Sequence, residues 1–174
     1  MPAALGLVVI CLLVVTSLPG ASANGRLIEP TMRSSLWRFD AEAPINYNDQ
    51  GLNCGGLQVQ YGENAGLCGV CGDSFYGPRD NEDGGLYASG GVVRRYRSGS
   101  LVTMVADVIV PKGGYFEVKL CPRDQLTTLV TQACFDAFTL KSPRLDSGLY
   151  KMEVQLPPGI TCAHCVIQWR YLTG

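Results

Sequence analysis

The sequence predicts an all-β fold in which two sheets pack as a sandwich and long loops are held by disulfides. Apolar and polar residues alternate with the period of a strand in several segments, and no helical period is sustained after residue 23. The stretch between residues 46 and 91 is instead rich in glycine, asparagine, aspartate and cysteine, which favour turns. No linker or internal repeat interrupts this pattern, so we expect one domain over residues 24–174.

Residues 1–23 have the pattern of a secretory signal peptide. An apolar run, LGLVVICLLVV at 5–15, is followed by the small residues Ala21-Ser22-Ala23 that signal peptidase accepts. The run is shorter than the about 20 residues that a membrane span needs. We therefore expect a secreted, extracellular protein without a membrane anchor, whose mature chain begins at Asn24.

Four segments are expected to be strands. Residues 101–110 form a nearly continuous apolar run with many β-branched side chains, which predicts a central strand of the sandwich. Residues 115–120, 150–156 and 165–172 alternate between apolar and polar side chains, which predicts strands with one buried face. The positions expected in the core are Phe116, Val118, Leu120, Tyr150, Met152, Val154, Leu156, Ile167, Trp169 and Tyr171.

The mature chain holds seven cysteines, and in a secreted chain such a set predicts a disulfide framework. They are Cys54, Cys68, Cys71, Cys121, Cys134, Cys162 and Cys165. The number is odd, so we expect one of them to lack its partner. A bridge between Cys121 and Cys134 is expected because the connection between them is short. Zinc binding by the two Cys-x-x-Cys pairs is disfavoured by the oxidising compartment and by the separation of about 90 residues between the pairs.

The charges predict a neutral partner. The chain has 14 basic and 15 acidic residues and a formal net charge of −1. Such a balance gives no long-range attraction to nucleic acid or to an anionic membrane. We expect a monomer that binds neither.

Several motifs resemble the arthropod-type lytic polysaccharide monooxygenases, which are secreted copper enzymes of the chitin-binding type-4 group that oxidatively cleave chitin or cellulose. The resemblance implies an immunoglobulin-like or fibronectin-III-like β-sandwich. It also implies that the chain is C-terminally incomplete, because the family continues past QWRY to a last strand. The matching motifs are GRLIEP at 25–30, RSSLWRF at 33–39, NYND at 46–49, CGG at 54–56, CGVCGD at 68–73, GGYFEVKLC at 113–121 and CVIQWRY at 165–171.

The resemblance implies a copper site of two histidines, and neither histidine is present. The family has a histidine directly before its Gly-Arg-Leu motif, where this chain has Asn24, and a second one where Lys112 is the nearest match. Imidazole is neutral near pH 7 and binds both oxidation states of copper, whereas an amide is a poor ligand and an ammonium must first lose a proton. We expect no metal or other cofactor here, although intact family members hold copper. His164 is expected to be a loop histidine, and one histidine cannot rebuild the site.

The same resemblance gives the candidate substrate-binding residues, which are Asn24, Arg26, Tyr47, Asn48 and Lys112. Sugars bind to flat surfaces that carry aromatic rings and hydrogen-bonding groups. Lys112 has a second interpretation, in which its ammonium replaces the charge of the copper ion, and a third, in which it is a solvated turn residue. Tyr47 and Asn48 have an alternative role in packing and turn formation within NYND.

Three functions remain open from the sequence. The first is a non-catalytic protein, without catalytic residues, that binds insoluble polysaccharide, with chitin or a related β-1,4-glycan expected. The second is a copper-dependent monooxygenase with an altered metal site. The third is a structural or cuticle-associated protein, or a shortened product, without carbohydrate activity.

Overall fold

The computed structural model describes residues 24–109, 113–140 and 148–173. The predicted signal peptide, Lys112 and the last residue of the strand predicted at 101–110 lie outside these ranges. Among the described residues, no helix is long and apolar enough to cross a membrane.

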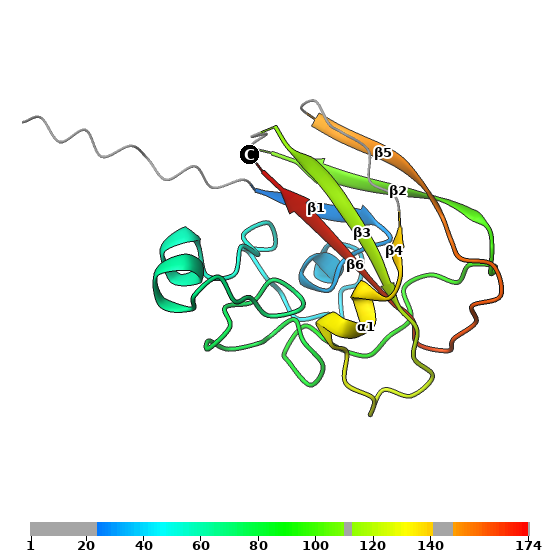
Figure 1. Cartoon of the computed structure of the whole chain (residues 1–174), viewed down its shortest axis with the longest axis horizontal. Helices are drawn as coiled ribbons and strands as arrows, with labels where there is room; N and C mark the ends of the chain where they lie inside the picture. The colour runs from blue at the N-terminus through cyan, green and yellow to red at the C-terminus, as the bar shows by residue number, and fades with distance from the viewer. Residues whose placement is uncertain (1–23, 110–112, 141–147, 174) are drawn as a thin grey trace, which may run out of the picture.

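Two three-stranded antiparallel sheets face each other (Figure 1). The first has the order β1-β2-β5, from strands Gly25–Glu29, Leu101–Val108 and Gly148–Gln155. The second has the order β4-β3-β6, from strands Thr139–Leu140, Tyr115–Cys121 and Val166–Leu172. The all-β sandwich predicted from the sequence is confirmed.

The core lies between the two sheets and is built from the alternating positions that the sequence predicts. Phe116 on β3 is fully buried. Its ring centroid lies 5.0 Å from that of Trp169 and 5.3 Å from that of Tyr171, both on β6. On the opposite sheet, Tyr150 meets the same ring edge-on at 5.5 Å. Aromatic rings therefore join the two sheets at the centre of the core.

The strand β2 is central in its sheet but is buried on one face only. Its residues alternate, with Val102, Met104, Ala106 and Val108 in the core and Leu101 56% exposed. The sequence predicted a central strand of the sandwich here, and this prediction is confirmed. Its outer face is only partly covered, because the described chain places no third layer over β1-β2-β5.

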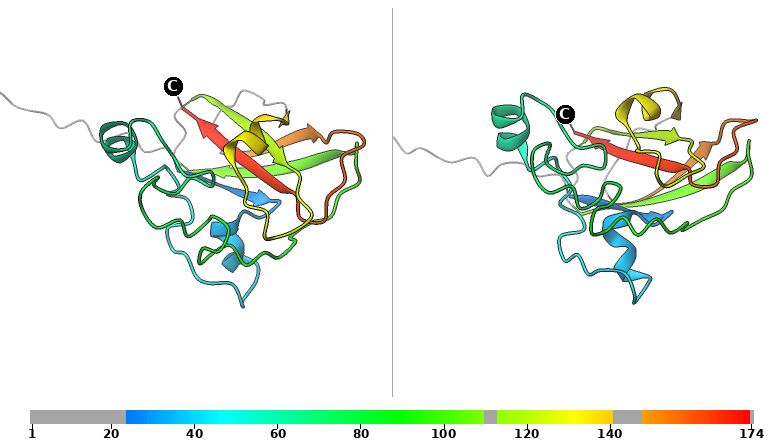
Figure 2. Two further views of the ribbon diagram at one scale, coloured as in Figure 1. Left: turned by 60° about the horizontal axis from the view of Figure 1, so that its bottom comes forward. Right: turned by 90° about the horizontal axis from the view of Figure 1, so that it is seen from below.

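A long connection between β1 and β2 forms most of the remaining structure (Figure 2). It contains a short 3-10 helix, η1 (Arg33–Arg38), and one turn of π-helix, η2 (Gln58–Glu63). A third short helix, α1 (Gln132–Asp136), follows β3, and its first turn is capped by the Thr131 hydroxyl, which accepts a hydrogen bond from the Cys134 N–H.

Six of the described cysteines are paired. Cys54 bonds to Cys68 within the long loops, and Cys121 bonds to Cys134, which confirms the predicted bridge. Cys162 bonds to Cys165 just before β6. Cys71 is the free cysteine of the described residues, so the prediction that one thiol lacks a partner holds for this part of the chain.

Candidate functional site

Asn24 lies at the end of the sandwich where β1 begins and β6 ends (Figure 1). Its carbonyl oxygen accepts a hydrogen bond from the N–H of Ile109, at 2.9 Å, directly after β2. Gly25 follows in a tight position, because a Cβ added there would lie 3.4 Å from the Trp169 ring and 3.3 Å from the Asp107 carbonyl oxygen. The start of β1 is thus fixed against both sheets.

Arg26, on β1, joins this end of the sandwich to the NYND turn. Its guanidinium lies 2.8 Å from the Asp107 carboxylate on β2 and 3.6 Å from that of Asp49. Asp49 has no exposed surface, and Arg38 at the end of η1 also binds it through Nε and Nη2. A buried carboxylate needs such partners, since an isolated charge in the interior is strongly disfavoured. Asp49 therefore fixes the turn that precedes it.

Tyr47 projects from that turn with 85% of its surface exposed. Its ring meets the Trp37 ring edge-on, with the two centroids 5.7 Å apart. The Arg38 guanidinium lies over the Trp37 ring, 4.4 Å from its centroid. These contacts hold an exposed aromatic side chain in one orientation. Asn48 beside it is exposed, and its N–H donates to the Asn46 side chain, at 3.0 Å, in a local turn.

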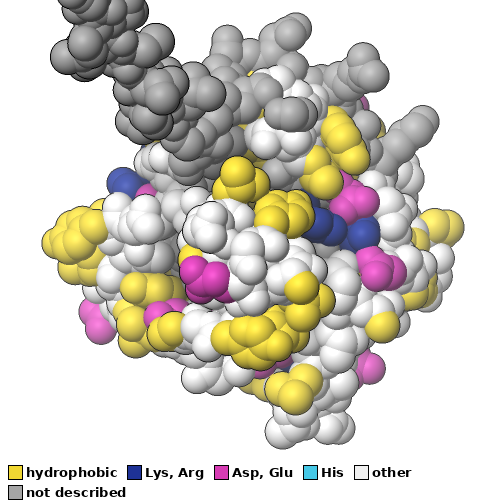
Figure 3. Space-filling model, turned by 60° about the vertical axis from the view of Figure 1, so that its left-hand side comes forward, with side chains coloured by type: hydrophobic (Ala, Val, Ile, Leu, Met, Phe, Trp, Pro, Cys, Tyr) yellow, Lys and Arg dark blue, Asp and Glu magenta, His cyan; other side chains and the backbone are white. Residues whose placement is uncertain are grey.

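The surface around the loops carries no strong field of one sign. On the face shown in Figure 3, acidic and basic side chains lie close together and hydrophobic side chains form separate patches. This agrees with the formal net charge of −1 and favours a neutral ligand.

The described residues do not fit a copper site of the family's kind. They contain no group of three or more histidine, cysteine, aspartate or glutamate side chains that could hold a metal ion. His164 precedes β6, whereas Asn24 lies near its far end, so the seven residues of β6, at about 3.3 Å each, separate them. The His164 N–H donates to the Arg123 carbonyl oxygen, at 2.9 Å. No imidazole from the described chain therefore reaches Asn24.

Comparison with known proteins gives the family. The chain matches, over residues 25–173, the family described as lytic polysaccharide mono-oxygenase, cellulose-degrading. The chain belongs to the lytic polysaccharide monooxygenase family. It is also similar to a solved structure, a lytic polysaccharide monooxygenase AA15 from Thermobia domestica in the Cu(I) state. The identity is 41%, the TM-score is 0.83, and the match covers 86% of this chain and 83% of that one. No curated protein matches the chain.

This family membership confirms the resemblance drawn from the motifs. Among the predicted site residues, Arg26 is joined to the turn of Tyr47 and Asn48 by its ion pair with Asp49, the next residue of that turn. Asn24 lies directly before β1, the strand that carries Arg26. Lys112 lies outside the described residues, between Ile109 and Gly113.

Sequence reasoning missed three residues that build this site: Trp37, Asp49 and Asp107. Trp37 and Asp49 belong to motifs that carried the family resemblance, RSSLWRF and NYND, so a signal for them was present. For Asp107 the one clue was a polar residue within an apolar strand run, and its partner could not be read from the sequence, because the pairing with Arg26 depends on the register of β1 against β2.

Proposed function

We propose that this monooxygenase-family protein is a secreted, non-catalytic protein that binds insoluble polysaccharide, with chitin or a related β-1,4-glycan as the ligand. The observation that carries the proposal is the exposed ring of Tyr47, which contacts Trp37 and lies in the turn that Asp49 joins to Arg26 on β1. An exposed aromatic ring fixed in orientation packs against the C–H face of a sugar with little loss of side-chain entropy. Members of the family in general act on such polymers, which supports the same ligand class.

The proposed surface consists of Asn24, Arg26, Tyr47, Asn48 and Lys112. Tyr47 supplies the apolar contact, and the side-chain amides of Asn24 and Asn48 supply donors and acceptors for hydroxyl groups. The charge of Arg26 is already shared between Asp49 and Asp107, so its role is to hold the turn in place. Lys112 enters from the sequence alone, as a cation at the position of the missing histidine.

The test is a pull-down of the mature protein on insoluble chitin, with cellulose in parallel. We expect binding to chitin, and we expect Tyr47→Ala to weaken it by about tenfold, which corresponds to the ~1 kcal/mol or more that one aromatic contact contributes. Tyr76→Ala is the matched control, because Tyr76 is similarly exposed at 77% but lies outside the proposed surface. Equal retention of both variants, or no retention of the unaltered protein, contradicts the proposal.

A copper-dependent monooxygenase is the second candidate, and family membership favours it. Asn24 disfavours this candidate, because its amide stands where the family's first copper ligand, an imidazole, is expected. Copper titration by calorimetry, followed by a peroxide-driven assay on chitin, separates the two candidates. We expect neither tight one-to-one copper binding nor oxidised oligosaccharides, and both together would establish the enzyme.

A further inference from the structure

Arg38, at the end of η1, lies close to the exposed ring of Tyr47. Its guanidinium carbon is 4.4 Å from the centroid of the Trp37 ring, and that ring meets Tyr47 edge-on with the centroids 5.7 Å apart. Both distances start from the Trp37 ring, so the Arg38 guanidinium and the Tyr47 ring lie within about 10 Å of each other. A short stretch of one polysaccharide chain can therefore contact both side chains.

The guanidinium of Arg38 keeps hydrogen-bond donors that the described chain does not use. Its Nε and Nη2 donate to the two carboxylate oxygens of Asp49. Its Nη1 donates to no group among the described residues, and 33% of the side chain is exposed. Because a guanidinium has five N–H donors, the two on Nη1 remain available to a ligand.

These free donors are held in place before a ligand binds. Asp49 is fully buried and binds one edge of the Arg38 guanidinium, while the Trp37 ring packs against its face. The hydrogen bond to Asp49 and the charges of Asp49 and Asp107 raise the pKa of Arg38, so the group stays protonated. Arg38 therefore presents a cation that only donates hydrogen bonds, and little of its side-chain entropy is left to lose on binding.

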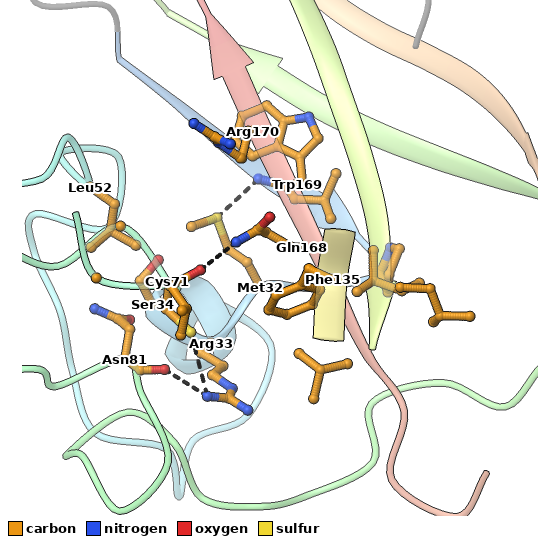
Figure 4. Close-up of a pocket in the computed structure, with 18 of the residues that line it drawn as sticks. Met32, Arg33, Ser34, Leu52, Cys71, Asn81, Phe135, Gln168, Trp169 and Arg170 are labelled. Carbon is orange, nitrogen blue, oxygen red and sulfur yellow. Dashed lines mark hydrogen bonds between the residues drawn. The ribbon is translucent and has the colours of Figure 1, made fainter. Parts of the chain in front are cut away.

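Arg38 lies apart from the large cavity between the sandwich and the loops. This cavity has a volume of about 1620 Å³, and its wall includes Arg33 and Ser34 at the start of η1 (Figure 4). Arg38 at the other end of η1 does not line it, and neither do Trp37 and Tyr47. The exposure of Arg38 therefore does not depend on what fills the cavity.

We propose that the Nη1 of Arg38 donates a hydrogen bond to the acetamide carbonyl oxygen of a sugar unit beside the one that stacks on Tyr47, so that the protein prefers N-acetylated polysaccharide. Chitin and cellulose differ at one position of each sugar unit, where chitin carries an acetamide and cellulose a hydroxyl. The amide carbonyl oxygen is the better acceptor for a charged donor, and such hydrogen bonds are the stronger ones. Deacetylation leaves an amine that is protonated in mildly acidic solution and is repelled by Arg38.

This inference rests on the proposed function, because it concerns the same polysaccharide surface. The first measurement uses the unaltered mature protein, whose retention is measured on chitin, on chitin deacetylated in graded steps and on cellulose in mildly acidic buffer. We expect the dissociation constant to be about tenfold higher on cellulose and on the most deacetylated chitin, as for the loss of one charge-assisted hydrogen bond. Equal dissociation constants on all three overturn the inference and leave the proposed function in place. No retention on any of them contradicts the proposed function itself.

The variant Arg38→Lys separates recognition of the acetamide from support of the Tyr47 turn. Lysine keeps the charge, but Asp49 holds its one ammonium group and no planar fork faces the ligand. We expect the dissociation constant on chitin to rise about tenfold, with less than about a twofold change on cellulose. Equal losses on the two polymers overturn the inference, because Arg38 would then act only by holding the turn.

Arg79→Lys is the matched control. The Arg79 guanidinium lies 4.8 Å from the centroid of the Phe75 ring, its side chain is 34% exposed, and it binds Glu82 at 3.0 Å. Arg79 thus has the same stacking, charge pairing and exposure as Arg38, but lies outside the proposed surface. We expect its variant to keep the preference of the unaltered protein for chitin, and a matching loss of that preference overturns the inference. Urea denaturation checks that both variants fold, and if Arg38→Lys does not, the acetylation series of the unaltered protein decides.

Discussion

The two sheets and the long loops between β1 and β2 are stabilised in different ways. In the sheets, the buried side chains are almost all apolar, with Phe116, Met104, Val118 and Val154 having no more than traces of exposed surface. In the loops, the buried groups include carboxylates, and each has dedicated partners. Asp49 binds Arg38 and Arg26, while Asp73 accepts hydrogen bonds from the N–H and Nδ2 of Asn81.

Asp83 is the clearest example of a loop carboxylate that is stabilised by charged and hydrogen-bonding partners. Its carboxylate lies 2.6 Å from Arg123 and 3.1 Å from Arg33, and it accepts the N–H of Val130 at 3.2 Å. Burial alone would raise the pKa of Asp83, but the hydrogen bonds from Arg123 and Val130 and the charge of Arg33 lower it below its usual 3.8. A segment rich in glycine and poor in apolar residues cannot build a hydrophobic core, so buried charge pairs and the Cys54–Cys68 disulfide fix its shape instead.

The sharpest test of the sheet side is Phe116→Ala. This change removes the ring that joins β3 to Trp169, Tyr171 and Tyr150 and leaves a cavity in the core. We expect a loss of about 3–5 kcal/mol in the free energy of unfolding. Urea denaturation followed by tryptophan fluorescence measures it, with Leu149→Ala, at an exposed position, as the control. A loss below about 1 kcal/mol would show that the core is not organised around this ring.

On the loop side, Asp83→Asn is expected to cost about 3 kcal/mol at neutral pH, because Arg123 is left buried without its charge partner. The lowered pKa of Asp83 means that its stabilisation is present above pH 3.8 and is lost as the pH falls through the folded-state pKa. The unfolding free energies of the unaltered protein and the variant should therefore begin to approach each other below pH 3.8 and converge as the pH falls through the lowered folded-state pKa. A difference that stays constant down to the lowest pH would exclude the ion pair as its cause.

A smaller effect is expected for Asp49→Asn, about 2 kcal/mol, because the amide keeps part of the hydrogen bonding and Arg26 keeps Asp107. Loosening of the Tyr47 turn should also weaken chitin retention. Asp40→Asn is the matched control, since Asp40 lies exposed on the same loop and its carboxylate accepts only the Glu42 N–H among the hydrogen bonds described. Unchanged chitin retention would separate the turn from the proposed surface.

The smallest effect on stability is expected for Tyr47→Ala. The side chain is 85% exposed, so its removal should change the free energy of unfolding by no more than about 0.5 kcal/mol. The prediction separates an effect on function from an effect on folding, since the same variant should bind chitin about tenfold more weakly. A large loss of stability would instead identify Tyr47 as a packing residue of the Trp37 cluster.

The strands and their buried faces were predictable because alternation is a local property of the backbone. Phe116, Met152 and Val154 each lie in the core as their period of two requires. Gln168 shows the limit of that reasoning. It was expected on the solvent face of β6, yet it is 8% exposed, because the loop at Val70 covers it.

In the candidate site, too, some residues could be predicted from the sequence and others could not. The motifs gave Tyr47 and Asn48 as candidates, and the resemblance that they carry leads one to expect a histidine where Asn24 stands, all of which is read from neighbouring residues. The partners Asp107 and Trp37 were not predicted, because Asp107 meets Arg26 only across 81 residues of sequence and Trp37 meets Tyr47 only after η1 has folded.

By itself, the sequence determined the sandwich class, the faces of its strands and the motifs that carry the family resemblance. Period-two patterning and residue identity act within a few positions of the chain, so they need no further information. The tertiary structure decided which carboxylates are buried and which cysteines of the described residues pair with one another. These depend on segments brought together from far apart, and their free energies come from contacts that exist only after the chain has folded.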